Sequence, residues 1–136
     1  LHLDAAERWG GTRKKLRDME ERVDAAFAMR PISFWEWDFA DGNILFDDRL
    51  PPILGMDREE MGNDIQWWNT IVHPEDRAKA QRLLTQHLKG EWGRFQARYR
   101  VRHREERWIW IDHKGKVLAR SADGRPRRMV GTIEDV

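Results

Sequence analysis

Histidine is the side chain in this 136-residue sequence most able to bind a metal, and the sequence contains five. His73 stands at a predicted helix start, with no second His or Cys near it at metal-ligand spacing. His87 lies late on the same predicted helix among leucines, where an ordinary packed histidine also fits. The sequence therefore predicts no metal site.

No pairing of a nucleophile with a base points to catalysis. The sequence has no Cys, which excludes disulfides, thiolate metal sites, cysteine nucleophiles and cysteinyl cofactor adducts, and which points to a reducing compartment, the cytoplasm. Ser33 and Ser121 lack the motifs of nucleophilic serines, and no glycine-rich phosphate loop occurs. We expect no catalytic residues and a chain that is not an enzyme.

A run of arginines is the strongest nucleic-acid signal, since Trp and Tyr side chains stand near it for stacking. Alternation along a strand places most of these arginines on one solvated face, where nearby Glu and Asp residues neutralise them. Single-stranded nucleic-acid binding is therefore the weaker alternative, and we expect no nucleic-acid partner. The run comprises Arg94, Arg98, Arg100, Arg102, Arg104 and Arg107.

The composition agrees with a small globular domain. The 25 Lys and Arg residues against 24 Asp and Glu residues leave a formal net charge of +1, so no long-range field steers the chain toward polyanions. The length and the 40% of hydrophobic residues suit one core. No stretch reaches the roughly 18 apolar residues that span a bilayer, so we expect no membrane segment in this chain.

The elements that position these residues begin with an amphipathic helix. Residues 12–29 lack Pro and repeat apolar side chains in a heptad-like pattern, while Gly10 and Gly11 weaken the helix before them and Pro31 ends it. The apolar stripe packs either on its own domain or on the same helix of a second chain. Its residues are Trp9, Leu16, Met19 and Val23.

Two strands and a helical block follow. Residues 34–39 and 43–46 alternate as strands do, around a turn at Asp41-Gly42. A short helical piece ends at Gly55, and after further short pieces a longer helix starts at His73-Pro74 and ends at Gly90.

The last third of the sequence predicts further strands. Residues 95–102 alternate apolar and basic side chains, and residues 108–111 have no polar gap, which predicts a strand covered on both sides. A turn at Lys114-Gly115 precedes a strand over 116–120, and the final strand covers 128–134.

Strands in two groups around a helical block favour an α+β fold with helices on one face of an antiparallel sheet. The motifs in this order are Trp35-Glu36-Trp37-Asp38 with Asp41-Gly42, Ile53-Leu54-Gly55, His73-Pro74-Glu75-Asp76-Arg77, Tyr99-Arg100-Val101, Trp108-Ile109-Trp110 and Gly131-Thr132 through Asp135. As an ordered set they resemble a PAS sensor domain, of the subtype with HPxDR and YR…W motifs, from about Ile32 to Val136.

The resemblance implies a five-stranded antiparallel sheet with short helices on one face, formed by residues 31–136 behind the amphipathic helix of residues 1–30. It also implies a sensory module of bacterial signal transduction, including two-component systems, that dimerises and relays a signal to a covalently linked output domain. That domain, a histidine kinase or a diguanylate cyclase, lies outside this chain. The sequence departs from the family at residues 103–107, where the family has a Gly-containing turn, and at Ala97-Arg98, where an acidic residue often precedes the tyrosine.

Aromatic and apolar side chains on the inner faces either line a pocket for a small organic ligand or fill the core. The sequence requires no cofactor, and the lack of Cys excludes a cysteinyl-flavin adduct. The resemblance leaves haem binding as an alternative, because haem-binding members of the family take their axial His from the long helix, where His87 stands. The candidate pocket residues are Trp37, Leu84, His87, Tyr99 and Trp110.

Asp135 stands at the family's exit position, and the resemblance implies that it couples the sheet to the connector, with Arg100 as a candidate ion-pair partner. We expect a homodimer in the cytoplasm. Its interface is predicted to be the stripe of Trp9, Leu16, Met19 and Val23, together with the sheet face that the helices leave uncovered.

Overall fold

The computed structural model describes residues 5–28 and 31–136, and within the first segment it describes the side chains of residues 11–25. The chain divides into two units between Arg30 and Pro31. The first unit is one helix, α1 (Ala5–Ala28).

Helix α1 includes Gly10 and Gly11, so the prediction that the regular helix starts at Thr12 was wrong. Each Gly costs about 1 kcal/mol relative to Ala, which weakens a helix without ending it when good helix formers stand on both sides. The predicted stripe residue Trp9 lies within α1, but its side chain is outside the described residues.

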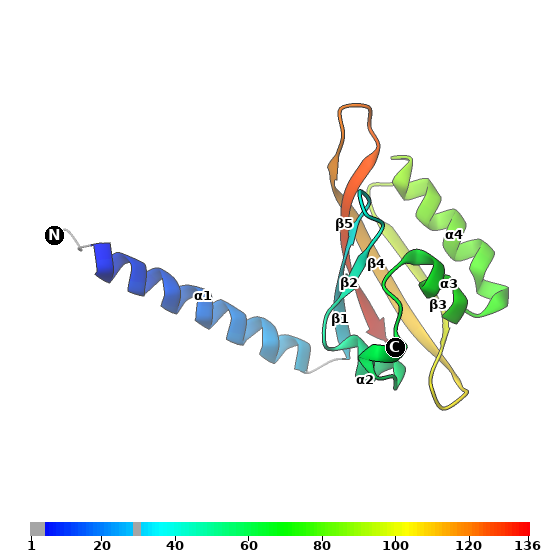
Figure 1. Ribbon diagram of the computed structural model, residues 1–136, viewed down its shortest axis with the longest axis horizontal. Helices are drawn as coiled ribbons and strands as arrows, with labels where there is room; N and C mark the ends of the chain where they lie inside the picture. The colour runs from blue at the N-terminus through cyan, green and yellow to red at the C-terminus, as the bar shows by residue number, and fades with distance from the viewer. Residues whose placement is uncertain (1–4, 29–30) are drawn as a thin grey trace. The chain divides into compact units, whose positions relative to one another are not determined.

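The second unit is an α+β fold with one five-stranded antiparallel sheet, as predicted. Its elements are β1 (Ile32–Asp38), β2 (Ile44–Phe46), α2 (Leu50–Leu54), the 3₁₀ turn η1 (Arg58–Glu60), α3 (Ile65–Ile71), α4 (Pro74–Leu88), β3 (Phe95–Arg102), β4 (Trp108–Arg120) and β5 (Pro126–Asp135). The strand order is β2-β1-β5-β4-β3, so the first long strand lies beside the last. Helices α2, α3 and α4 lie against one face of the sheet (Figure 1).

The predicted turns and helix ends are confirmed where local chemistry fixes them. Gly42 and Gly55 adopt φ values of 77° and 65°, a region that favours glycine, and Gly55 ends α2. His73 caps α4 by accepting a hydrogen bond from the backbone N–H of Glu75 through Nδ1 at 3.1 Å. Pro74 then occupies the first turn, where its missing N–H costs nothing.

The turn predicted at Lys114-Gly115 is wrong, because β4 runs without interruption through both residues. At position 115 the Trp35 ring occupies the space that a side chain would need. A Cβ on Gly115 would stand 2.7 Å from that ring, which is closer than packed atoms approach. The glycine that suggested a turn thus serves close packing within a strand.

Trp35 lies at the centre of the inner face. It pairs with Gly131 of β5, which in turn pairs with Gly115 of β4. The indole rests on these two glycines, and a Cβ on Gly131 would collide with the Trp35 ring and with the backbone carbonyl of Lys114. One aromatic side chain therefore packs across three neighbouring strands.

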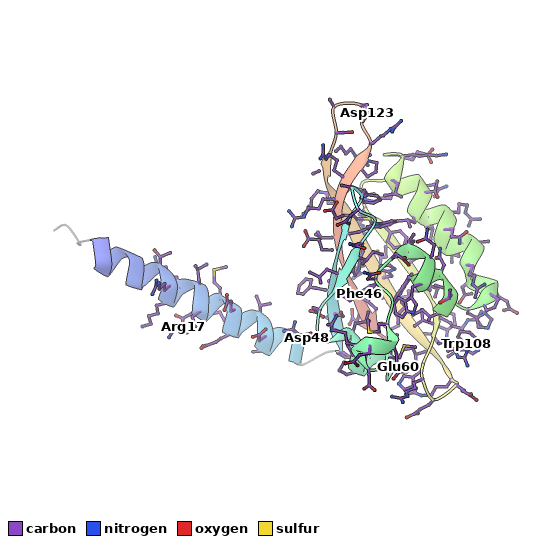
Figure 2. The ribbon with its side chains drawn as sticks, in the orientation of Figure 1. Arg17, Phe46, Asp48, Glu60, Trp108 and Asp123 are labelled. Carbon is purple, nitrogen blue, oxygen red and sulfur yellow. The ribbon has the colours of Figure 1, made fainter. Side chains whose placement is uncertain are left out.

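The face opposite the helices carries two exposed tryptophans. Trp108 and Trp110 are 45% and 51% exposed, while Ile109 and Ile111 between and after them are buried. The prediction that this strand is covered on both sides was wrong, since four consecutive apolar residues here alternate between the core and the outer face. Figure 2 labels Trp108 at the end of the sheet away from the Asp123 turn.

The hairpin at residues 103–107, where the sequence departs from the family pattern, closes without glycine. Glu106 takes the left-handed conformation instead, with φ of 59°. A non-glycine residue in this region costs roughly 1 kcal/mol or more.

We expect Gly131→Ala to destabilise the fold by about 1–3 kcal/mol, because the added methyl group displaces the Trp35 ring or separates β5 from β4. Gly93→Ala is the matched control, since no atom lies within 4 Å of the position that its methyl group would take. The control should stay within about 0.5 kcal/mol of wild type. Urea denaturation measures both, and equal effects would show that Trp35 does not depend on the glycine.

Candidate functional site

A cavity of about 220 Å³ lies between α3, α4 and the inner face of β3 and β4. Asn69, Gln81 and Thr85 stand at its solvent side, and the buried Trp68 and Tyr99 form its wall. No lining residue carries a carboxylate or a lysine or arginine cation. The lining is Ile65, Trp68, Asn69, Val72, Ala80, Gln81, Leu84, Thr85, Phe95, Tyr99 and His113.

A second, nearly filled cavity of about 20 Å³ adjoins this one and shares five of its lining residues. Trp35, Trp37 and Phe46 line it from the side of β1 and β2. Phe46 stacks on Trp68 of α3 with ring centroids 5.7 Å apart, and Figure 2 labels it in this region. The aromatic side chains thus fill most of the core and leave open space on the α4 side.

Three polar groups form a hydrogen-bond chain in the cavity wall. Trp68 Nε1 donates to the Tyr99 hydroxyl at 2.7 Å, and that hydroxyl lies 2.6 Å from His113 Nδ1. Among the described residues Nδ1 is the one acceptor within reach of the hydroxyl hydrogen, since the indole is a donor only, so the buried hydroxyl donates to Nδ1 of the imidazole. The neutral ring then carries its hydrogen on Nε2.

Desolvation fixes the protonation states of Tyr99 and His113, the two titratable groups in this hydrogen-bond chain. It lowers the pKa of His113 to about 3 and raises the pKa of Tyr99, so both side chains are neutral near pH 7. The aromatic rings of Trp35, Trp68 and Phe95 surround the imidazole with centroids 5.0–5.6 Å away.

Two N–H groups at these cavities lack a hydrogen-bond partner among the described residues. One is His113 Nε2, on a partly exposed imidazole that makes its hydrogen bond through Nδ1, and the other is the buried Trp35 Nε1. Of the two, the Trp35 N–H is the buried one, and a buried donor left unpaired costs about 1–3 kcal/mol. The cavity walls therefore offer donors for which a bound molecule with an acceptor atom would be the natural complement.

Three of the predicted pocket residues do lie at these cavities. Leu84 lines both of them, Tyr99 lines the larger and Trp37 lines the smaller. Sequence analysis missed His113, whose side chain follows Ile109 and Ile111 on the inner face at intervals of two residues. The turn wrongly predicted at Lys114-Gly115 concealed that alternation.

His87 is buried but lines neither cavity. Its Nε2 accepts the backbone N–H of Val117 at 3.0 Å, so Nδ1 carries the hydrogen and donates to the carbonyl of Trp92 at 2.7 Å. Both ring nitrogens are thus used to join α4 to β4 and to the loop before β3. His87 has no nitrogen left for a haem iron.

Trp110 lies on the opposite face of the sheet, so its assignment to the pocket was wrong. In β4 the odd-numbered Ile109 and Ile111 face inward, and the even-numbered tryptophan must face outward.

Known proteins share this architecture. A family model described as the PAS fold matches residues 43–133, about two thirds of the chain. The chain belongs to the PAS family. No curated protein matches the sequence.

Solved structures of PAS domains superpose on the chain. A sensory box histidine kinase/response regulator from Burkholderia thailandensis is 30% identical, with a TM-score of 0.71 over 85% of this chain and 84% of that one. The N-terminal domain of a diguanylate cyclase with a PAS/PAC sensor from Marinobacter aquaeolei is 21% identical, with a TM-score of 0.66 over 76% and 94%. Cycle PAS-B from Drosophila melanogaster with bound ethylene glycol is 13% identical, with a TM-score of 0.60 over 76% and 99%.

In this PAS domain the HPxDR segment fastens α4 to β3. The Asp76 carboxylate accepts hydrogen bonds from the backbone N–H of Arg100 and from its guanidinium Nε and Nη2, all at 2.9 Å. The guanidinium lowers the pKa of Asp76 to about 2. Arg100 also lies over the Trp110 ring at 5.3 Å.

The predicted ion pair of Arg100 with Asp135 is not formed. Arg100 is engaged by Asp76 and Glu75, and in the described part of the chain Asp135 has no ion pair. The backbone N–H of Asp135 donates to the carbonyl of Pro31 at 3.0 Å, which ties the end of β5 to the start of the PAS unit.

Most of the predicted basic run is paired within the PAS domain. Arg104 contacts Asp57 and Glu60, Arg107 contacts Glu105, and Arg98 lies 4.0 Å from the buried Asp112. These pairs favour the solvated-face interpretation. Among the described residues no three His, Asp or Glu side chains come together as a metal site.

A pH titration tests the state of His113. Its pKa is about 3 in the folded protein and near 6.5 when exposed, so between these values the unfolded chain binds a proton that the folded chain excludes. Stability therefore falls as the pH is lowered from about 6.5. We expect urea titrations to show wild type losing about 1.4 kcal/mol per pH unit more than His113→Gln in this window. Identical slopes would contradict the buried neutral state.

Proposed function

We propose that this PAS domain is the regulatory input module of a larger cytoplasmic signalling protein, that it has no catalytic activity, and that it binds a small molecule in the cavity beside α4. Its membership of the family and its likeness to domains of a histidine kinase and a diguanylate cyclase support the regulatory role. No helix in the described part of the chain has the length and apolar character needed to cross a membrane.

The observation that carries the binding proposal is an open cavity whose wall includes a neutral donor, His113 Nε2, without a partner among the described residues. The ligand that fits is small and uncharged, with an acceptor oxygen or nitrogen for His113 Nε2. An ionised ligand would find no opposite charge, because Tyr99 and His113 are both neutral and the remaining lining is apolar or amide and hydroxyl.

The signal would pass through the sheet. Strands β3 and β4 form the cavity wall, β4 pairs with β5, and β5 ends at Asp135, where we propose that the chain continues to a histidine kinase or diguanylate cyclase. We also propose that the protein dimerises through α1, since Leu16, Met19 and Val23 are 56%, 59% and 44% exposed on one stripe of that helix.

Thermal shift with a panel of small alcohols, ketones and amides, with ethylene glycol among them, tests the binding proposal. We expect at least one compound to raise the Tm of wild type, since a ligand that binds only the folded state stabilises it. Ala80→Leu narrows the cavity and should abolish the shift. Ala78→Leu is the control, because Ala78 is exposed on α4 and does not line the cavity.

Two outcomes would count against a ligand cavity. One is a panel in which no compound raises the Tm of wild type. The other is a compound whose shift is the same in Ala80→Leu and Ala78→Leu, because it would then bind elsewhere.

A further inference from the structure

The hydrogen-bond chain in the cavity wall has a direction, and its indole member sets that direction. An indole N–H can only donate, so Trp68 Nε1 occupies a lone pair of the Tyr99 oxygen and offers no acceptor to the hydroxyl hydrogen. Among the described residues that hydrogen has one acceptor, His113 Nδ1, at an oxygen–nitrogen distance of 2.6 Å. The neutral imidazole therefore carries its own hydrogen on Nε2.

The opposite direction would leave a buried hydrogen without an acceptor. With its hydrogen on Nδ1, His113 would donate to the Tyr99 oxygen, which already accepts from Trp68. The hydroxyl hydrogen would then have no acceptor in the described part of the chain, although Tyr99 is only 3% exposed. An unpaired buried donor disfavours a state by roughly five- to a hundredfold. The chain thus holds His113 in one tautomer.

The end of this chain is available to a ligand. His113 lines both cavities and is partly exposed. Its pKa of about 3 keeps the ring neutral near pH 7, so the tautomer and not the charge decides whether Nε2 donates or accepts. The hydrogens of Trp68 Nε1 and of the Tyr99 hydroxyl are both used within the chain.

We propose that Trp68 and Tyr99 determine which ligands the cavity accepts, by holding His113 in the tautomer whose Nε2 is a donor. They are positioning residues, because they act through the imidazole. The ligand class that fits has an acceptor without a hydrogen at its inner end, such as a ketone or an ester, and a ligand that can only donate is rejected. This inference rests on the ligand binding proposed above and specifies its selectivity.

The tautomer is measurable without any ligand, by nitrogen NMR of the full chain labelled in its histidines near pH 7. His113→Gln identifies the signals of His113 among the five histidines. We expect wild type to show a protonated Nε2 and an unprotonated Nδ1. Tyr99→Phe removes the hydroxyl and keeps the ring, so it should show both tautomers. Thr85→Val is the matched control, because it removes a cavity hydroxyl outside the chain and should keep the wild-type pattern.

Ligand selectivity gives a second measurement, by NMR titration with two rings of similar size. Cyclopentanone only accepts hydrogen bonds, whereas pyrrole only donates one. Wild type and Thr85→Val should bind cyclopentanone about tenfold or more tightly than pyrrole. Tyr99→Phe should bring the two affinities within about threefold, because its imidazole can then accept through Nε2.

The outcomes separate this inference from the proposed function. A wild-type His113 with its hydrogen on Nδ1 would overturn the inference, and so would a Tyr99→Phe spectrum with the wild-type tautomer alone. Both results hold whether or not a ligand binds, and the first needs no variant. Pyrrole that binds wild type as tightly as cyclopentanone would disprove the selectivity but not the cavity. A thermal-shift panel without any stabilising compound would instead remove the ligand itself, and the selectivity with it.

Discussion

The packing of Trp35 on two glycines organises the rest of the PAS unit. The indole needs Gly131 and Gly115 on the adjacent strands, and this contact fixes β1, β5 and β4 against one another. The same ring contacts His113 and lines the smaller cavity, so it also supports one side of the candidate site. Because interiors are close-packed, moving this ring would move three strands at once.

The candidate site combines an apolar surround with a short polar chain. The Trp68, Tyr99 and His113 groups satisfy one another in sequence, and the chain ends on an N–H with no partner among the described residues. His113 Nε2 is thus a donor that a ligand in the cavity could use, whereas His87 has both ring nitrogens satisfied and is a structural residue.

Local signals predicted the parts of this fold that local chemistry controls. The Asp41-Gly42 turn, the Gly55 helix stop and the His73-Pro74 helix start depend on a few adjacent residues, and each was identified correctly. The error in the last third of the sequence occurred where a distant residue decides. Gly115 resembles a turn in sequence, and only the Trp35 ring explains why it lies within a strand; that error concealed His113.

The fold class, the family and the alternation that places apolar side chains on one face of each strand could all be read from the sequence, because they follow from periodicity and from the order of motifs. Which polar groups meet depends instead on the folded chain. Arg100 binds Asp76 rather than Asp135, and Tyr99 meets His113, because strand register and the docking of α4 set distances between residues 14 and 24 positions apart. No short-range pattern contains that information.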